Sequence, residues 1–324
     1  MIERVVTIGE GLAVFRSDPG EPLWQVDRVA VGTGGAEANV AMTLAHRGLP
    51  VTWCGRIGDD ALGRRVVREL RAEGVTVRTV VDSQRPTGLL VKDARADGRT
   101  TVSYYRTNSA GSALSPADAA DLIGGVGGGT LVHVTGVTCA LSETAKQAVL
   151  RTVAAAKDAG ALVSFDVNHR SRLWNGQSPV STYRKVAALA DLVFASVDEV
   201  AFLTDGPEKK PAGDDLDSAL DALRRAGYDH AVVTAGAAGA AAVHEGKTAT
   251  EPAQRVTAVD TVGAGDAFVG GYLASWARGG TLSNRLRAGA VSGAAACRHG
   301  GDWEGATDLT GLSPDDVGAD PVVR

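Results

Sequence analysis

Short runs of β-branched residues alternate with alanine-rich stretches along most of this chain, and this alternation constrains the fold more than any other feature. The expected strands lie at residues 5–8, 51–54, 131–134 and 162–165, and the expected helices at 36–46, 59–73 and 143–159. Such alternation is typical of parallel strands joined by crossover helices. We therefore predict an α/β fold with a mostly parallel central sheet, flanked by helices on both faces.

The helix expected at 143–159 has signals at both of its ends. Ser142 can cap the first turn, and Glu143 places a negative charge at the positive end of the helix dipole. Gly160 follows and can adopt the left-handed conformation that ends a helix. We predict that the helix begins after Ser142 and stops before Gly160.

Two regions, 23–31 and 89–106, interrupt the alternation. Both are expected to be extended, and the second holds two β-rich runs around a turn at 93–98. We predict a small antiparallel sheet, inserted into the larger domain, that covers a site on the main sheet as a lid. The α/β catalytic domain is then expected to comprise residues 1–22, 32–86 and 110–324, and the β-sheet lid residues 23–31 and 87–109.

Three further segments are interpreted as connections. The glycine-rich stretch 124–129 precedes an expected strand, whereas a phosphate loop follows a strand and opens a helix, so we expect a turn. Residues 205–215 contain two prolines and a lysine pair, which indicates a surface loop. The tail after Gly305 is polar.

Charge and composition exclude several classes of partner. The 324 residues carry a formal net charge of -5, which leaves no cationic excess for nucleic acid or an anionic membrane. The N-terminus has no basic region followed by an apolar stretch, and no segment approaches the roughly 18 apolar residues of a membrane span. We expect a cytoplasmic protein. Cys54, Cys139 and Cys297 are widely spaced without a CxxC pattern, so we expect buried thiols rather than a disulfide or metal site.

The segment 258–274 contains the turn Gly263, Ala264, Gly265 and Asp266, which leads directly into an apolar helix. Glycines allow a ligand to approach the backbone, and the first amides of a helix are unpaired donors at a positive dipole end. These features predict an anion site with Asp266 beside it. The simpler alternative is a turn whose aspartate favours the helix dipole.

Three motifs in order resemble the ribokinase-like (PfkB) carbohydrate kinase family: DTVGAGDAF at 260–268, GGAEAN at 34–39, and GRIGDD at 55–60 with Gly63. The resemblance covers residues 4–305 and implies the ribokinase-like fold. It also implies ATP as phosphoryl donor and Mg²⁺ as counter-ion, with room for a monovalent cation. Asp266 would be the catalytic base, and the amides around Gly263, Ala264 and Gly265 would stabilise the transferring phosphoryl group.

The same resemblance assigns nucleotide and metal residues. Thr234, Gly236 and Gly239 are similar to the family's nucleotide loop, although a spaced glycine pair is also typical of a tight turn. Glu199 ends a segment that resembles the one organising Mg²⁺ through water; a carboxylate that only starts a helix is the alternative. Gly263 and Gly265 are expected to contact the nucleotide as well.

Within the family, the chain most resembles 2-keto-3-deoxygluconate kinases. This resemblance rests on segments 104–106 with 111–114, 165–170 with 173–174, and 301–305. It implies a sugar site formed by Gly35, Asn39, Tyr104, Arg106, Arg170, Asp266 and Asp302. A guanidinium fork can bind a carboxylate through two parallel hydrogen bonds, so the arginines favour an acidic sugar over a neutral one.

Relatives of this subfamily usually have tyrosine where this chain has Leu90. The identity of the substrate is therefore left open. A fructokinase or ribokinase would use the same base on a neutral sugar. From another class, the chain could be a non-catalytic sugar-binding regulator on a kinase scaffold, although Asp266 and the glycine turn argue against that. We also predict a homodimer joined through the lid, because an inserted small sheet exposes edges and an apolar face.

Overall fold

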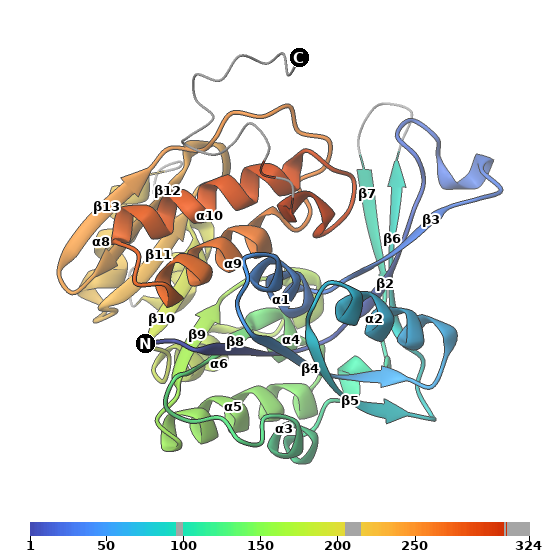
Figure 1. The fold of residues 1–324 in the computed structure, drawn as a ribbon, viewed down its shortest axis with the longest axis horizontal. Coiled ribbons are helices and arrows are strands. Elements are labelled where there is room, and N and C mark those ends of the chain that lie inside the picture. Colours follow the sequence, from blue (N-terminus) through green and yellow to red (C-terminus); the bar gives the residue numbers. More distant parts are fainter. Residues whose placement is uncertain (95–99, 205–214, 308, 310–324) are drawn as a thin grey trace.

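The computed structural model describes residues 1–94, 100–204, 215–307 and 309. Its main sheet has nine strands in the order β13-β12-β11-β10-β9-β8-β1-β4-β5 (Figure 1). All neighbouring strands are parallel except the pairs β11–β12 and β12–β13 at one edge, which are antiparallel. The strands are β1 Arg4–Ile8, β4 Val51–Gly58, β5 Thr76–Asp82, β8 Thr130–Thr135, β9 Leu162–Asp166, β10 Leu192–Ser196, β11 His230–Thr234, β12 Ala240–His244 and β13 Lys247–Glu251.

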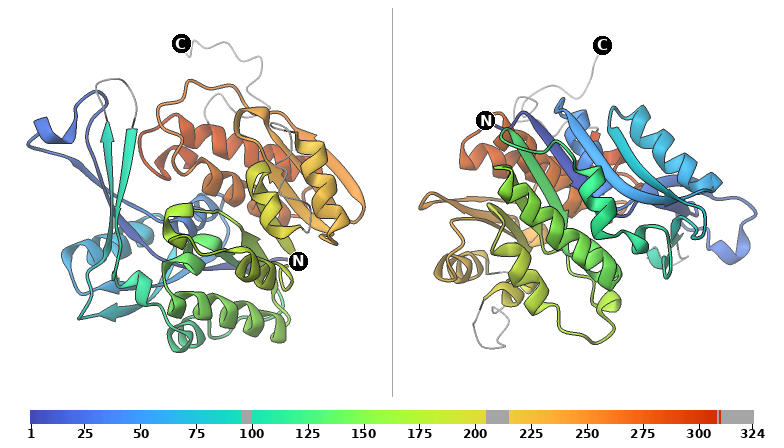
Figure 2. Two further views of the ribbon diagram at one scale, coloured as in Figure 1. Left: turned by 180° about the vertical axis from the view of Figure 1, so that it is seen from behind. Right: turned by 90° about the horizontal axis from the view of Figure 1, so that it is seen from below.

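Helices cover both faces of this sheet (Figures 1 and 2). One face packs against α1 Ala36–His46, α2 Ala61–Ala72, α9 Ala264–Ala277 and α10 Leu282–Cys297. The other packs against α3 Pro116–Leu122, α4 Gly136–Leu141, α5 Glu143–Asp158, α6 Val180–Ala187, α7 Val200–Leu203 and α8 Leu216–Arg225. Because alternate strand residues point to opposite faces, Val5 joins one apolar core and Val6 the other. The predicted α/β architecture is confirmed.

Local signals account for the helix ends. Helix α1 has the predicted bounds, and Ser142 caps α5 by accepting a hydrogen bond of 3.0 Å from Ala145 N. Gly160 follows α5 with φ +73°, as predicted. Helix α2 begins at Ala61, two residues later than predicted, because the Asp60 side chain accepts from Gly63 N at 2.7 Å and so acts as the N-cap.

The small sheet that we predict to act as a lid, called the lid below, has four strands in the order β3-β2-β6-β7, and β2 lies outside the lid residues predicted from the sequence. It stands to one side of the main sheet in Figure 1. Its strands are β2 Leu12–Arg16, β3 Ala30–Gly34, β6 Gly88–Ala94 and β7 Thr100–Tyr105. The prediction of a purely antiparallel sheet was wrong, because β2 pairs with β6 in parallel. Each of these two strands follows a parallel strand of the main sheet, β1 and β5, and therefore enters the lid in the same direction.

Other expected segments differ in detail. Of region 23–31, only the part from Ala30 onward is strand, and a 3-10 turn spans Leu23–Gln25. Leu23 N donates to Asp93 Oδ1 at 2.8 Å, which holds this turn against β6. Five other 3-10 turns lie at Gly111–Ala113, Ser171–Trp174, Val197–Glu199, Gly236–Ala238 and Glu304–Thr307. The loop expected at 205–215 lies, except for its last residue, outside the described residues, as does most of the tail.

All three cysteines are free; Cys54 and Cys139 are buried and Cys297 is half-buried. Burial raises the pKa of both Cys54 and Cys139 to about 12, so these thiols stay protonated at neutral pH. Over the described ranges, no helix combines the length and apolar character needed to cross a membrane.

Candidate active site

The N-terminus of α9 is the centre of the site. Gly263 precedes it with φ +82°, and a Cβ at this position would lie 1.8 Å from the carbonyl oxygen of Asp302, so only glycine fits. At Gly265 an ideal Cβ would meet no atom within 4 Å, which leaves open space beside the first turn. No side chain caps this helix. Ala264 N donates to the Thr261 carbonyl at 3.3 Å, which leaves the amides of Gly265 and Asp266 in the first turn for an anion; the anion site itself stays a prediction.

Asp266 lies in the first turn of α9 and is 7% exposed. Its two carboxylate oxygens accept separate hydrogen bonds, Oδ2 from Asn39 Nδ2 at 2.8 Å and Oδ1 from Asn168 Nδ2 at 3.0 Å. Burial raises the pKa of Asp266 to about 6, against the lowering effects of Asn39, Arg170 and Asn168. A carboxyl group with this pKa is ionised at neutral pH and still able to accept a proton.

Asn168 is a site residue to which the sequence analysis assigned no role. Its backbone adopts the left-handed conformation, with φ +38°, just beyond the carboxyl end of β9. Its Nδ2 also donates to Asp166 Oδ2 at 3.0 Å, so one amide joins two carboxylates. Asparagine tolerates this conformation better than most residues, and its place after a central parallel strand is the signal that could have identified it.

Glu199 and Asp166 form an acidic group next to Asp266. The pKa of Asp166 is raised well above its ordinary value, mainly by burial and further by the negative charges of Glu199 and Asp266. The Glu199 carboxylate accepts from Ser196 N at 2.7 Å and from His169 N at 2.5 Å, so it acts as a cap at the start of the turn after β10. Its contact with Mg²⁺ through water stays a prediction.

Arg170 is exposed and lies near this acidic group. Its Nη1 donates to the carbonyl of His169 at 3.3 Å, and its charge lowers the pKa of both Asp166 and Asp266. The guanidinium thus lies near enough to the expected base to act on it electrostatically, with most of its donors facing solvent.

Arg106, in contrast, is buried and already paired. Its Nε donates to Glu10 Oε2 at 2.7 Å and its Nη2 contacts the same oxygen, while Ser109 Oγ donates to Oε1. Tyr104 is 43% exposed and lies over this arginine, with its ring centroid 5.4 Å from Cζ. Glu10 was not predicted from the sequence as part of the site. The expected contact of Arg106 with the sugar stays a prediction.

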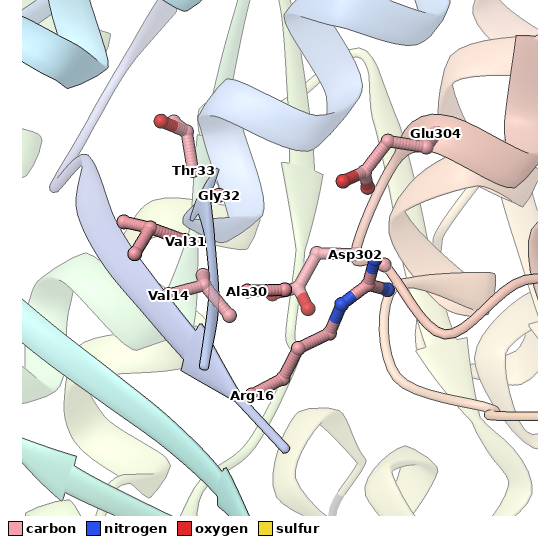
Figure 3. A pocket seen from close by; sticks show the side chains of 9 residues that line it. Val14, Arg16, Ala30, Val31, Gly32, Thr33, Asp302 and Glu304 are labelled. Carbon is pink, nitrogen blue, oxygen red and sulfur yellow. The ribbon is translucent and has the colours of Figure 1, made fainter. Parts of the chain in front are cut away.

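The remaining predicted sugar residues lie where the lid meets the main domain. Gly35 has φ +122°, and a Cβ there would lie 2.2 Å from the Glu10 carbonyl. Asp302 is buried and contacts Lys92 of β6, with Nζ 2.5 Å from Oδ1. A small pocket between β2, β3 and the loop at 301–304 is lined by Asp302 and Arg16, among others (Figure 3).

The predicted nucleotide loop begins with Thr234 at the end of β11. Gly236 and Gly239 have φ of +52° and +100°, and a Cβ at Gly239 would lie 2.3 Å from the Glu251 carbonyl. Ala235 N donates to Gly239 O at 2.9 Å, which closes a tight turn. Because β9, β10 and β11 are parallel neighbours, this turn shares a sheet edge with Asn168 and Glu199.

A buried carboxylate thus lies at a helix start without a side-chain cap, on the carboxyl edge of a parallel sheet that carries a second, smaller sheet, which is the arrangement expected of a sugar kinase with the ribokinase-like fold. The chain belongs to the pfkB family of carbohydrate kinases, whose family model matches residues 3–308. It is an ATP-dependent carbohydrate kinase. A non-catalytic regulator, the alternative from another class, is therefore not proposed.

Individual relatives differ in their substrates. The chain is 36% identical to the 2-dehydro-3-deoxygluconokinase of Bacillus subtilis, over 93% of this chain and 91% of the relative. It is 35% identical to a fructokinase of Klebsiella pneumoniae, over 78% and 79% of the two chains. Among solved structures, a putative ribokinase II from E. coli in complex with ATP and Mg²⁺ matches with a TM-score of 0.83 and 25% identity, over 96% of this chain and 98% of that one.

Proposed function

We propose that the chain transfers the γ-phosphoryl group of ATP to the 6-hydroxyl of 2-keto-3-deoxygluconate, which is also called 2-dehydro-3-deoxygluconate. The observation that carries this proposal is Arg170, an exposed guanidinium that acts electrostatically on the buried base Asp266. A sugar acid held by that fork would present a hydroxyl toward the base. The similarity to the Bacillus subtilis enzyme supports the same substrate.

In the proposed mechanism, Asp266 accepts the proton of the hydroxyl as its oxygen attacks the phosphorus. Asn39 and Asn168 hold the carboxylate in one orientation, since each occupies one of its oxygens. The amides around Ala264 and Gly265 donate to the phosphoryl oxygens, where negative charge gathers in the transition state. The lid excludes water that would otherwise accept the phosphoryl group.

The proposed nucleotide site joins the turn before α9 to the loop Thr234, Gly236 and Gly239. The open space beside Gly265 fits the approach of a phosphate. Within the described residues, no three acidic, His or Cys side chains are placed to hold a metal. Glu199 and Asp166 would hold Mg²⁺ through water, together with the phosphates of ATP. Bound there, Mg²⁺ would neutralise charge on the phosphates; a monovalent cation and a cytoplasmic location remain predictions.

Fructose is the second candidate substrate. Arg106 is already paired with Glu10. Leu90, opposite Tyr104 in the lid, occupies the position where 2-keto-3-deoxygluconate kinases usually have a tyrosine. The lid therefore offers fewer polar groups to a sugar acid. A neutral sugar has no carboxylate and would need fewer cationic side chains in its site. The similarity to the Klebsiella pneumoniae fructokinase is in keeping with this alternative.

A homodimer through the lid is also proposed. Strand β7 is the edge of the lid sheet and is mostly exposed, with Tyr105 66% exposed. Trp24, on the β2–β3 connection, is 80% exposed. An open strand edge with exposed aromatic side chains is a surface that a second copy could cover.

The function is tested by measuring ADP release with 2-keto-3-deoxygluconate, fructose, ribose and nucleosides under matched conditions. We expect the highest kcat/KM with the sugar acid, and phosphorus NMR should locate the product phosphate on carbon 6. A higher kcat/KM for fructose would replace the first candidate with the second. No turnover with any sugar would contradict the substrate proposal in both forms.

A further inference from the structure

Lys92 is a buried cation between the lid and the main domain. It lies on β6, and its side chain is 3% exposed. Its Nζ is 2.6 Å from Asp260 Oδ2, 2.5 Å from Asp302 Oδ1 and 3.4 Å from the carbonyl of Gly300. Lysine is rarely buried unless it is paired, because an ammonium group loses its hydration. We call Lys92, Asp260 and Asp302 the lid bridge.

The charge of the lid bridge is maintained by its own members. Burial alone would lower the pKa of Lys92, but Asp302 and Asp260 outweigh this effect and raise it above the ordinary lysine value. In the same way, burial raises the pKa of Asp302 while Lys92 opposes the rise. The ammonium therefore remains charged, and its removal would leave two carboxylates without their cation.

Both aspartates of the lid bridge lie at the start of the turn that opens α9. Asp260 Oδ1 accepts from Val262 N at 3.0 Å, immediately before Gly263. The Asp302 carbonyl fills the space where a side chain at Gly263 would stand, since a Cβ there would lie 1.8 Å from it. A shift of either aspartate would therefore move the backbone that carries Asp266.

The lid contacts Asp302 from two strands. A Cβ at Gly34, the last residue of β3, would lie 2.5 Å from Asp302 Oδ2, while Lys92 approaches Oδ1 from β6. Figure 3 shows Asp302 at the pocket between the lid strands and the 301–304 loop. The position of the lid and the position of Asp302 are thus linked by direct contact.

We propose that Lys92 is a positioning residue through which the lid sets the geometry of the turn from Gly263 to Asp266. The lid bridge transmits the lid position to the start of that turn, so phosphoryl transfer is fast only when β6 packs against the main domain. This inference rests on the proposed role of Asp266 as base. Since Lys92 acts through the turn, its loss should reduce kcat more than it raises KM for ATP.

The test compares Lys92→Met with Lys92→Arg and with a matched control, Lys157→Met. Lys157 pairs with Asp191 at 2.6 Å, so the control also removes a lysine–aspartate pair, but away from the turn. We expect Lys92→Met to lose about 100-fold in kcat, the scale of a misplaced catalytic group. Lys92→Arg keeps the charge and should recover part of this loss, and Lys157→Met should retain wild-type kcat.

Amide hydrogen exchange gives a second readout that needs neither sugar nor nucleotide. Lys92→Met should exchange faster in residues 260–268, whereas the control should not. This result would stand even if the chain phosphorylated none of the sugars tested, which separates the lid bridge from the proposed substrate. Faster exchange in β6 alone, or a kcat within about twofold of wild type, would overturn the proposal.

If Lys92→Met does not fold, Asp260→Asn provides the same test. It removes one carboxylate from the lid bridge and keeps an oxygen that can accept from Val262 N. We expect about a tenfold loss in kcat and faster exchange at 260–268. Wild-type values for both would overturn the role of Lys92.

Discussion

Replacement of Asn39 by alanine should move the acidic limb of the pH–rate profile upward. The wild-type limb is expected near pH 6, because burial raises the pKa of Asp266 to about 6 and only the ionised carboxylate acts as a base. Asn39 donates to Asp266 Oδ2 at 2.8 Å and so stabilises the ionised form. Without this donor, a proton binds more tightly and the base is ionised only at higher pH.

The size of the shift follows from the strength of that hydrogen bond. A bond to an ionised group contributes about 1.5–3 kcal/mol, and one pKa unit corresponds to about 1.4 kcal/mol, so the limb should move by about one to two pH units. At pH 7 the ionised fraction of Asp266 would fall by about two- to tenfold, and turnover would fall with it. At about pH 9 this loss should disappear, because the carboxylate is ionised in both proteins.

The assay measures kcat and kcat/KM from about pH 5 to pH 9, with the control Asn284→Ala, which replaces an asparagine in the first turn of α10. The control should keep the wild-type profile. Because Asn39 is also expected to contact the sugar, its replacement can raise KM at every pH. A loss of kcat that is the same from pH 6 to pH 9, with an unmoved acidic limb, would refute the assignment of this bond to the pKa of Asp266.

Other substitutions test the remaining parts of the site. Asp266→Asn should lower turnover by about two to four orders of magnitude while MgADP still raises Tm; near-normal turnover would exclude it as the base. Burial raises the pKa of Asp266 from 3.8 to about 6, so the native state loses stability as pH rises through this interval, and Asp266→Asn should flatten that dependence in thermal unfolding. Arg170→Ala should lower kcat/KM for the sugar acid by about 30-fold or more, with partial recovery in Arg170→Lys; an unchanged ratio of activities on acidic and neutral sugars would remove its role. Tyr105→Arg should shift sedimentation toward the monomer at micromolar concentration, and a wild-type protein that is already monomeric would rule out the dimer.

Much of the fold was predictable because its signals are local. Helix α1 has the predicted bounds, and the caps of α5 were identified from Ser142 and Gly160. The turn at Gly263 was identified because glycines directly before an apolar helix are typical of a tight turn, while its role as an anion site stays a prediction. The direction of β2 beside β6 was not predictable in this way, since it depends on which strands of the main sheet lead into the lid.

By itself, the sequence predicted the α/β class and the glycine turn, because both depend on residues that are close in the chain, and a family resemblance made Asp266 the expected base. Only the tertiary structure decided which side chains surround that base. Asn39 and Asn168 reach it across 227 and 98 positions, and Glu10 reaches Arg106 across 96. Such pairs form where separately folded segments pack together, and neither composition nor periodicity records which of many polar residues will meet. Lys92 illustrates the same limit: along the chain it is one lysine in a strand, and its burial between two carboxylates exists only once the lid lies on the main domain.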